Sequence, residues 1–490
     1  MVDDQLVAAN KIVGRVDPLR LLEGVLASKE PEFLAVYGRR RVGKTYLIRS
    51  YFEERSTFFE LTGRVKGTLR MHLALFAESL SDAFLGGVPS APPRSWHDAF
   101  QSLRTAVEQR ARGDRKIVLF FDELPWLATR RGGLLEELEL FWNRHASRMR
   151  HVVLIVCGSA ASWMLQKVVH ARGGLHRRLT RTLRLLPFSL PETTAYLEWR
   201  GLRFTLDEVV ELYMTLGGVP HYLRLLEQGE SIAQNIDRLC FGRSSPLRGE
   251  LDEVFASLFD HADSHRRMVE VLARQRGGMA MNDALDAAHM ASGGGATRLI
   301  TALDEAGFIS SHAPFGRSSR NRLLRVTDPF SLFAVRWMRS GRTRRWSQLR
   351  GSPSWHAWAG LAFEMVCLEH IPAIQHALGI SGVQVEASPW HHRGADGGAG
   401  AQIDLLLDRA DNVISVCEMK FTEGPFAVDK RYAEDLRRKL AVFREETGTR
   451  KALRLVLVSA RGLRRSRWSD SLVDAIVTLE DLFATPRGLR

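Results

Sequence analysis

Along the first half of the chain, short runs of apolar residues alternate with longer segments in which apolar residues recur at helical spacing. Three short runs, at residues 33–37, 117–121 and 152–156, consist almost entirely of aliphatic and aromatic residues. Such runs are typical of strands that are buried on both faces, as in a parallel sheet. The segments between them have the amphipathic spacing of helices. We therefore predict an α/β domain with a parallel sheet over residues 10–185.

The rest of the chain predicts three further parts. Residues 186–258 have a helical pattern with a break at Gly217-Gly218-Val219-Pro220, and we interpret them as a helical lid. In residues 259–345 two helices precede two strands, which suggests a winged helix. Residues 354–490 mix strands and helices and form a third part. The expected elements are helices at 265–274, 296–307, 358–369 and 429–445, strands at 308–312, 321–326 and near 383, 403 and 413, and a loop at 391–400.

Charge and cysteine content narrow the functional class. The chain has 490 residues, 45% of them hydrophobic, and a formal net charge of +13. A chain this basic is expected to meet a polyanion, either nucleic acid or an anionic membrane surface. A generally arginine-rich surface is the alternative. The four cysteines (Cys157, Cys240, Cys367 and Cys417) form no CxxC pair, so we expect neither a zinc site nor a disulfide framework.

The sequence shows no targeting or membrane signal. The N-terminus, Met1-Val-Asp-Asp-Gln, lacks the basic and apolar regions of a signal peptide. The most apolar stretch, residues 152–164, is too short to cross a bilayer and contains Gly158 and Ser159. We read it as a buried strand and its continuation, and we expect a cytoplasmic protein that does not enter a membrane.

Residues 38–45 match the phosphate-binding pattern G-x4-G-K-[ST]. They follow the predicted strand at 33–37 and open a predicted helix at 45–52, which is the context that this motif requires. The glycines let backbone N–H groups turn toward phosphate oxygens, and the helix N-terminus adds to the attraction. Lys44 is expected to reach the β- and γ-phosphates of ATP, and Thr45 to coordinate Mg²⁺. The predicted ATP-binding residues of the loop are Gly38, Arg39, Arg40, Arg41, Val42, Gly43, Lys44 and Thr45.

Two carboxylates end the predicted strand at 117–121. We expect Asp122 to hold Mg²⁺, directly or through water, and Glu123 to activate the attacking water as general base. Two solvated acids at a strand end are the alternative. At the end of the strand at 152–156, Ser159 is a candidate for sensing the γ-phosphate. Arg177 and Arg178 can neutralise charge in the transition state, from the same subunit or a neighbour, or can be ordinary surface arginines.

These segments resemble the prokaryotic archaeal-type ATPase family, a relative of the AAA+ and STAND NTPases. The resemblance covers about residues 10–240 and implies an ATPase. It implies that Gly14 and Arg15 lie near the adenine and that the glycine-rich break belongs to the helical lid. It does not fix which arginine acts on the nucleotide, and it leaves a homo-oligomer open. The segments that carry it are Val13-Gly14-Arg15, the P-loop, Asp122-Glu123, residues 186–190 and Gly217-Gly218-Val219-Pro220-His221-Tyr222-Leu223.

A second set of acids lies near the C-terminus. If residues 402–420 form a hairpin centred on Asp411, Asp404 lies opposite Glu418. Glu418 and Lys420 are two residues apart and share one face of a strand. The two carboxylates can hold Mg²⁺ or Mn²⁺, the lysine can orient water, and Glu364 on the preceding helix can complete the set.

This arrangement resembles the PD-(D/E)XK nuclease-like fold, which often follows the ATPase in archaeal-type ATPases as a domain of unknown function. The resemblance covers about residues 354–490. It departs from the pattern at Ile403, where the namesake proline of the fold would stand. Metal-dependent cleavage and a decayed nuclease that only binds are both compatible with the sequence.

The segment at 259–345 resembles winged-helix DNA-binding domains. Residues 297–303 would form the recognition helix, with Arg298 as its one evident base reader, and residues 315–325 the wing, whose arginines suit phosphate contacts. A structural connector is the alternative. The sequence therefore predicts a DNA-associated ATPase whose nucleotide state controls a nuclease-like domain. A STAND-like switch with an inactive C-terminal module, and a transcription regulator that uses the winged helix alone, remain as alternatives.

Overall fold

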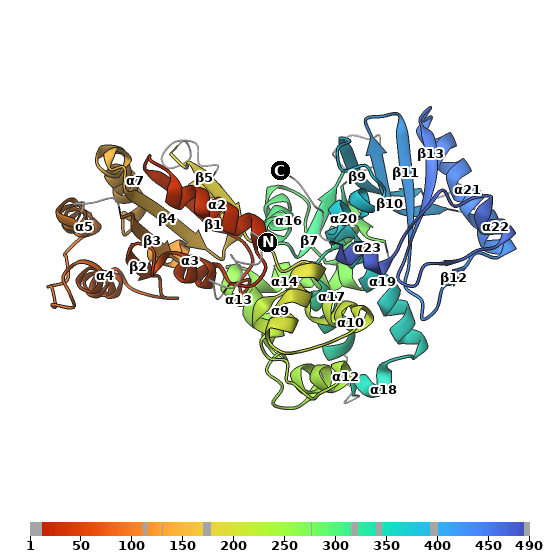
Figure 1. Ribbon diagram of the computed structural model, residues 1–490, viewed down its shortest axis with the longest axis horizontal. Coiled ribbons are helices and arrows are strands. Elements are labelled where there is room, and N and C mark those ends of the chain that lie inside the picture. The colour runs from red at the N-terminus through yellow and green to blue at the C-terminus, as the bar shows by residue number, and fades with distance from the viewer. Residues whose placement is uncertain are drawn as a thin grey trace. The chain divides into compact units, whose positions relative to one another are not determined.

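The computed structural model describes residues 12–110, 115–129, 131–169, 178–275, 277–313, 315, 322–339, 345–392 and 400–484 (Figure 1). The chain divides into two compact units, Met1–Pro187 and Phe188–Arg490. Arg177 and most of the predicted wing, including Arg317 and Arg320, lie outside the described residues.

A parallel sheet forms the centre of the first unit. Its described strands stand in the order β2-β3-β4-β1-β5, and every neighbouring pair is parallel. The strands are β1 (Glu32–Tyr37), β2 (Thr57–Thr62), β3 (Ile117–Asp122), β4 (Val152–Gly158) and β5 (Arg181–Arg184). The helices are α2 (Val16–Ala27), α3 (Lys44–Phe52), α4 (Leu69–Phe84), α5 (Trp96–Arg110), α6 (Leu124–Leu127), α7 (Leu134–Arg144) and α8 (Ala161–Met164).

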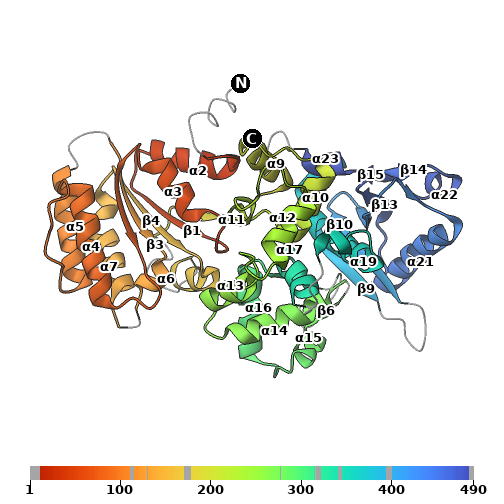
Figure 2. The ribbon, with the colours of Figure 1, turned by 90° about the horizontal axis from the view of Figure 1, so that it is seen from below.

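Helices cover both faces of this sheet. In β1, Phe33 and Ala35 join a hydrophobic cluster with α4, α5 and α7, whereas Leu34 and Val36 join a cluster with α2 and α3 (Figure 2). A strand buried on both faces needs an uninterrupted apolar run, because neither face meets water. The predicted α/β fold with a parallel sheet is therefore confirmed, and the three predicted strands are β1, β3 and β4.

The second unit is built around one continuous hydrophobic cluster, which extends from Phe188 to Leu482. The segments that we expected as lid, winged helix and C-terminal part all contribute to it. Its helices are α9 (Leu190–Trp199), α10 (Leu206–Leu216), α11 (Pro220–Leu223), α12 (Ile232–Ile236), α13 (Glu250–Leu258), α14 (Ala262–Ala273), α15 (Met281–Ala287), α16 (Gly294–Glu305), α17 (Pro329–Phe333), α18 (Trp346–Leu349), α19 (Pro353–Glu369), α20 (Ile371–Ala377), α21 (Lys430–Thr447), α22 (Arg467–Asp470) and α23 (Leu479–Phe483).

A small antiparallel sheet follows the first helices of this unit. Its order is β6-β8-β7, formed by β6 (Met279–Ala280), β7 (Ile309–His312) and β8 (Leu323–Val326). Helix α14 precedes β6, and α15 and α16 stand between β6 and β7. The two predicted helices and two predicted strands are present. Strand β6 was not predicted, because a strand of two residues has too few positions to show an alternating pattern.

The larger sheet of this unit has the described order β15-β13-β11-β10-β9. Strands β9, β10 and β11 are antiparallel, and β13 and β15 continue the sheet in parallel with β11. Helix α19 packs on one face, in the large cluster, and α21 packs on the other (Figure 2). The strands are β9 (Val385–His392), β10 (Ala401–Arg409), β11 (Val413–Lys420), β13 (Ala452–Ser459) and β15 (Ala475–Val477), and β12 (Phe426–Ala427) pairs with β14 (Leu463–Arg464).

One expectation changes in this part. The loop expected at 391–400 is wrong at its first two positions, because His391 and His392 still belong to β9; residues 393–399 lie outside the described ones. Within the described residues no single helix has the length and apolar character to cross a membrane. Helices α19 and α20 pass this test only as a pair, and they are bent by 76° relative to each other.

Gly218 gives the first testable prediction. A Cβ atom on this residue would lie 1.8 Å from the carbonyl oxygen of Phe188, so Gly218→Ala forces the backbone apart where the lid begins. We expect a loss of about 1–3 kcal/mol in the unfolding free energy of the second unit, as for other overpacked sites. Urea unfolding followed by tryptophan fluorescence measures this loss.

Gly360→Ala is the matched control. A Cβ on Gly360 would meet no atom within 4 Å, and the residue lies inside α19. The substitution is therefore expected to be neutral or to stabilise by up to about 1 kcal/mol. Equal losses in the two variants would contradict the close approach of Gly218 to Phe188.

Candidate nucleotide site and a second acidic cluster

The loop between β1 and α3 has the backbone that the glycine pattern predicts. Gly38, Arg41 and Gly43 have φ values of 147°, 71° and 93°, a region that L side chains rarely adopt. A Cβ on Gly38 would lie 2.2 Å from the carbonyl oxygen of Leu185, whereas a Cβ on Gly43 would meet nothing within 4 Å. The space beside Gly43 is thus open at the N-terminus of α3, where backbone N–H groups attract anions.

Lys44 is buried, with 5% of its surface exposed. Its ammonium group donates to the carbonyl oxygens of Gly38 and Arg39, at 3.0 and 2.9 Å, and to the Ser159 hydroxyl at 3.0 Å. Two of these acceptors belong to its own loop, and the third follows β4. The charge of Lys44 is therefore held inside the loop that the motif predicts for phosphate.

The side chains of Thr45, on α3, and Asp122, at the end of β3, are in direct contact. The Thr45 hydroxyl donates to Asp122 Oδ2 at 2.7 Å. Asp122 is 2% exposed, and its Oδ1 has no hydrogen-bond partner among the described residues. Burial raises the pKa of Asp122, and the Thr45 hydroxyl offsets part of this rise. A hydroxyl and a carboxylate with a free buried oxygen fit the oxygen ligands that Mg²⁺ prefers.

Glu123 is connected to the loop through Ser159. It has a left-handed backbone, with φ of 47°, directly after β3. The backbone N–H of Ser159 donates to Glu123 Oε2 at 3.1 Å, and the Ser159 hydroxyl donates to Oε1. Because the same hydroxyl accepts from Lys44, the three side chains form one hydrogen-bonded chain. The sequence analysis identified these residues separately and did not predict that the Ser159 hydroxyl connects them.

The remaining residues that we predicted to bind the nucleotide differ in their burial and in their contacts with the phosphate loop. Arg15 is 5% exposed, and its guanidinium donates to the carbonyl oxygens of Leu186 (2.7 Å) and Val42 (3.0 Å). It therefore braces the phosphate loop against the end of the first unit. Arg178 is exposed, and no contact joins it to the loop among the described residues. The other predicted residues are buried (Arg39, Val42) or partly buried (Gly14, Arg40, Arg41) and lie on or beside the loop.

The C-terminal hairpin has the predicted register. Leu405 pairs with Cys417, and Asp408 pairs with Ile414, so the hairpin is centred on Asp411. The position next to Leu405 then brings Asp404 opposite Glu418. Asp404 is 8% exposed, and its Oδ2 accepts from the backbone N–H of Met419 at 3.2 Å. Burial, and then the Glu418 carboxylate, raise the pKa of Asp404.

Glu418 is surrounded by donors. Lys439 donates to its Oε1 at 2.7 Å, and the Tyr432 hydroxyl and Lys420 donate to Oε2 at 3.0 and 3.3 Å. The sequence analysis missed Tyr432 and Lys439. They are seven residues apart on α21 and therefore lie on one face of the helix. This spacing could have identified them from the sequence, but only if α21 were already known to cover the sheet.

Glu364 on α19 meets an arginine from outside the larger sheet. Arg325 Nη2, on β8, lies 2.8 Å from Glu364 Oε2, and Arg325 is 4% exposed. The prediction that Arg325 is a wing arginine facing phosphate is therefore wrong, since its guanidinium is buried against a carboxylate. Burial, and then the nearby Asp404 carboxyl, raise the pKa of Glu364 to about 7.

We define the acidic cluster as Glu364, Asp404 and Glu418. Each of its carboxylates has a separate partner, and among the described residues no group of three or more histidine, cysteine, aspartate or glutamate side chains is arranged to hold a metal ion. In this conformation the cluster does not fit a divalent cation.

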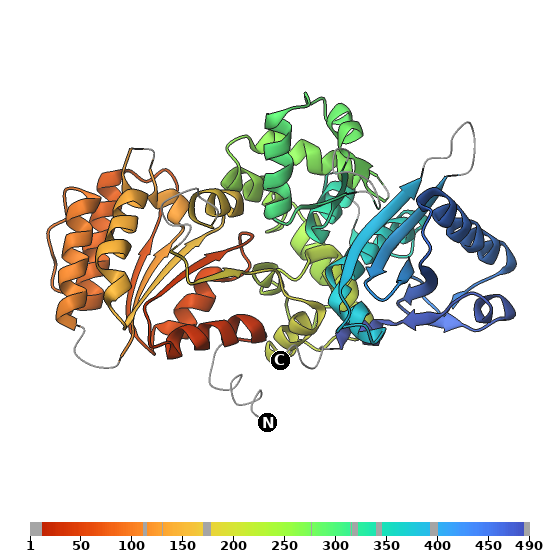
Figure 3. The ribbon, with the colours of Figure 1, turned by 90° about the horizontal axis from the view of Figure 1, so that it is seen from above.

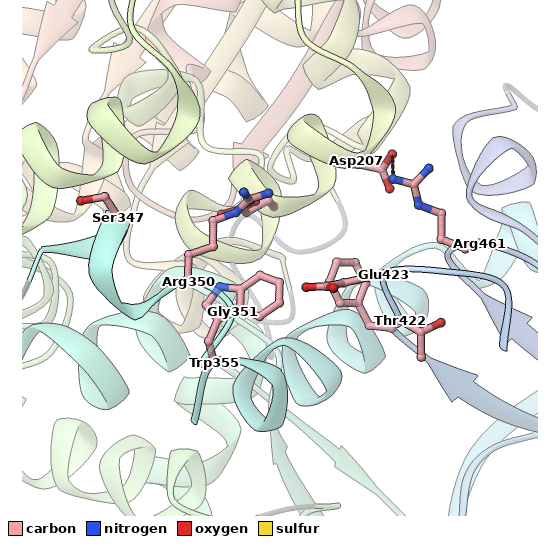
Figure 4. A pocket seen from close by; sticks show the side chains of 10 residues that line it. Asp207, Ser347, Arg350, Gly351, Trp355, Thr422, Glu423 and Arg461 are labelled. Carbon is pink, nitrogen blue, oxygen red and sulfur yellow. Dashed lines mark hydrogen bonds and ion pairs between the residues drawn. The ribbon is translucent and has the colours of Figure 1, made fainter. Parts of the chain in front are cut away.

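A cavity of about 440 Å³ opens elsewhere in the second unit (Figure 4). Trp355 and Phe421 form an aromatic pair in its lining, with ring centroids 6.1 Å apart. Two ion pairs join residues of its lining: Arg461 with Asp207 at 2.7 Å, and Arg350 with Glu211 at 3.0 Å. Most of the charges of this cavity therefore neutralise one another.

A parallel sheet whose edge carries a glycine-rich loop, a buried lysine and a threonine–aspartate contact defines a P-loop ATPase. Residues 12–226 match the family model described as "ATPase domain predominantly from Archaea", so this part of the chain is similar to archaeal-type ATPase domains. The match supports ATP as ligand and ATPase activity for the domain.

Three similar proteins match more of the chain than this domain. The uncharacterized protein MJECL04 of Methanocaldococcus jannaschii is 23% identical over 437 residues, 87% of this chain and 91% of that protein. The Walker-type ATPase paby2304 of Pyrococcus abyssi has a similar structure, with a TM-score of 0.51 and 18% identity, covering 66% of this chain and 96% of that one. The ORC2 protein of Aeropyrum pernix has a TM-score of 0.38 and 17% identity, with coverage of 66% and 93%. The P. abyssi structure supports the P-loop ATPase fold.

The raised pKa of Glu364 predicts how stability depends on pH. Its ordinary value is 4.5 and its value in the folded chain is about 7, so between these values the folded protein keeps a proton that the unfolded chain has lost. The unfolding free energy therefore contains a contribution that is present below pH 4.5 and is lost as pH rises to about 7, by at most about 3 kcal/mol. Glu364→Gln removes this contribution. Urea unfolding of both proteins across this pH range measures it, and parallel curves would contradict it.

Proposed function

We propose that this chain is a Mg²⁺-dependent ATPase that associates with DNA and uses its nucleotide state to control a nuclease-like C-terminal domain. One observation carries the ATPase part: the buried Lys44 and the carboxylate of Glu123 share the Ser159 hydroxyl, while Thr45 contacts Asp122. The P-loop and the two acids thus belong to one site.

In this proposal each residue has a separate role. Lys44 exchanges its loop carbonyl acceptors for the β- and γ-phosphates of ATP, and the N–H groups at Gly43 and the start of α3 hold phosphate oxygens. Thr45 and Asp122 would hold Mg²⁺, which neutralises charge on the phosphates. Glu123 takes a proton from the attacking water as general base. Since Ser159 occupies both carboxylate oxygens of Glu123, the serine has to release at least one of them for this step.

Element order supports the proposed identities of the two C-terminal parts. The sequence α14-β6-α15-α16-β7-β8 with a small antiparallel sheet is the order of a winged helix. The order α19-α20-β9-β10-β11-β12-α21-β13, with acids on α19, β10 and β11, agrees with the PD-(D/E)XK-like proposal. Arg298 is exposed on α16 and is the proposed base contact.

A second function is favoured by the partners of Glu418. Because Lys439, Tyr432 and Lys420 all donate to it, the acidic cluster has internal cations in place of a metal ion. This observation supports a STAND-like switch whose C-terminal domain binds without cutting. Plasmid and oligonucleotide cleavage, measured with and without ATP and Mg²⁺, separates the two functions: cleavage that Lys420→Ala abolishes supports the nuclease, and its absence in all conditions supports the switch.

Lys44→Ala is expected to abolish tight ATP binding and turnover, because the phosphates lose their buried cation. Nucleotide titration and phosphate release measure the two effects. Lys167→Ala removes an exposed lysine of the same unit and should leave both unchanged. Normal turnover by a folded Lys44→Ala protein would overturn the assignment of the site.

Glu123→Gln is expected to keep ATP binding and to slow hydrolysis by a factor on the order of 10²–10⁴, the usual effect of removing a general base. Single-turnover hydrolysis of bound ATP gives this factor directly. Glu136→Gln, on the exposed side of α7, is the control. If hydrolysis by Glu123→Gln stays near the wild-type rate, another group activates the water.

DNA binding is expected to weaken steeply with salt, because a basic surface releases counterions from DNA. Neutralising Arg317, Arg320 and Arg322 together should flatten the plot of log affinity against log salt, by about one unit for each arginine that no longer meets a phosphate. Fluorescence anisotropy with a short duplex measures the slope. A control variant neutralises three exposed arginines of the lid, Arg203, Arg224 and Arg243, and an equal change in both variants would argue against wing contacts.

A further inference from the structure

A short arginine-rich segment follows β13. Residues 461–467 read Arg461-Gly-Leu-Arg464-Arg465-Ser-Arg467. Arg461 is used inside the unit, since it pairs with Asp207 at 2.7 Å. Arg464, Arg465 and Arg467 are exposed. The segment therefore brings three guanidinium groups to the surface of the C-terminal part.

Two contacts hold this segment beside the start of α21. Strand β14 pairs in parallel with β12, with Arg464 opposite Ala427. The Ser466 hydroxyl donates to the carbonyl oxygen of Val428 at 3.0 Å. Helix α21 begins at Lys430, two residues later, so its first turn lies close to the arginines.

Helix α21 adds two cations to the same surface. Lys430 and Arg437 are exposed and seven residues apart, so they lie on one face of the helix. Arg437 Nη2 donates to the hydroxyl of Ser471, directly after α22, at 3.1 Å. Figure 3 shows α21 as the long blue helix on the outside of the larger sheet (Figure 3). We define the basic surface as Lys430, Arg437, Arg464, Arg465 and Arg467.

Acids neutralise only part of the basic surface. Lys430 lies 4.0 Å from Glu434, and Arg465 lies 3.3 Å from Asp470. Asp429 stands beside Lys430 as the N-cap of α21. In the described part of the chain, the other three cations have no carboxylate within ion-pair distance: Arg437, Arg464 and Arg467. The surface therefore keeps an excess of positive charge.

The donors of the basic surface suit phosphate groups. Four of its five cations are arginines, and a guanidinium offers paired N–H groups that match two oxygens of one phosphate. Arg467 is also held in place, because its guanidinium carbon lies 4.6 Å from the centre of the Trp468 ring. A guanidinium on an aromatic face keeps the N–H groups at its edge for another acceptor.

The distribution of apolar residues favours nucleic acid over a membrane surface. A segment that binds a membrane usually combines cations with exposed large apolar side chains that enter the lipid. Among the described residues, the large apolar side chains that are strongly exposed all lie between Val16 and Trp199. The phosphate backbone of a nucleic acid needs cations alone.

The basic surface and the acidic cluster lie on opposite sides of α21. Tyr432 and Lys439 donate to Glu418. Lys430 and Arg437 each stand two positions before one of these donors, and two positions are about 200° apart around a helix axis. A duplex bound to the basic surface is therefore held on the side of α21 that faces away from the acids.

We infer that the basic surface binds the phosphate backbone of duplex DNA, independently of sequence, and anchors the C-terminal part to DNA without presenting the DNA to the acidic cluster. This inference rests on the second proposed function, a switch whose C-terminal domain binds without cutting. It gives that domain its own contact with DNA, separate from the proposed winged helix.

The test measures binding of the full-length chain to a fluorescent DNA duplex at several salt concentrations. The variant carries Arg464→Gln, Arg465→Gln and Arg467→Gln together. Its plot of log affinity against log salt should be shallower than that of the wild type, by about one unit for each arginine that meets a phosphate. Lysine at the same three positions keeps the charge and should keep the wild-type slope.

A matched control removes the same charge elsewhere on the C-terminal part. Arg444, Arg450 and Arg454 are exposed and do not belong to the basic surface. Their joint replacement by glutamine should leave the slope as in the wild type. ATP hydrolysis by all variants should match the wild type, which shows that the chains are folded.

Each outcome decides a separate point. Equal slopes in the two glutamine variants overturn the basic surface and leave DNA binding by the winged helix standing. No DNA binding by the wild type overturns the inference together with the proposed association with DNA. Competition by polyglutamate or by phosphatidylserine vesicles as strong as that by unlabelled DNA, at equal charge, overturns DNA as the partner. Mg²⁺-dependent cleavage of the duplex that the arginine-to-glutamine variant loses overturns the role of a non-cutting anchor.

Discussion

Lys44 must keep an ammonium group where it has almost no contact with water, and the geometry of the first unit depends on how this is done. A buried charge is tolerated only when acceptors surround it. Two acceptors come from its own loop, and the third, Ser159, comes from the end of β4. Because β4 stands between β1 and β3 in the sheet, the residue that holds the lysine also reaches Glu123 at the end of β3. A different strand order would separate the lysine from the acid.

In the second unit, the buried carboxylate of Glu364 is balanced in a different way. In the first unit every described partner of Lys44, Thr45 and Asp122 comes from the same sheet and its loops. In the second unit, Glu364 is neutralised by a strand of a separate small sheet. The first unit thus balances its buried charge within one sheet, and the second unit balances it between two.

The parts that the sequence predicted share one property: their signal is local. The apolar runs of β1, β3 and β4 and the spacing from Gly38 to Thr45 depend only on neighbouring residues, and the hairpin about Asp411 has a register that follows from counting. Strands β2 and β5 were missed because they stand at the edges of the sheet, where polar residues such as Arg181 are tolerated.

The contacts that sequence reasoning missed are long-range. Ser159 and Glu123 are 36 residues apart, and Arg325 and Glu364 are 39 apart. An arginine in a basic segment has the same sequence signal whether it faces DNA or a buried glutamate. The prediction of Arg325 as a phosphate contact therefore failed for lack of information on burial, which only the packing of β8 against the larger sheet supplies.

The continuous hydrophobic cluster of the second unit has a consequence for how the protein is made. Leu479 and Leu482, on α23, belong to the same cluster as Phe188 and Leu190 at the other end of the unit. The N-terminus of the chain emerges from the ribosome first, so the first unit can complete its sheet while synthesis continues. The second unit cannot close its interior until its last helix has emerged. The apolar side chains of the lid, which begin at Phe188, therefore stay incompletely packed until α23 has been synthesised.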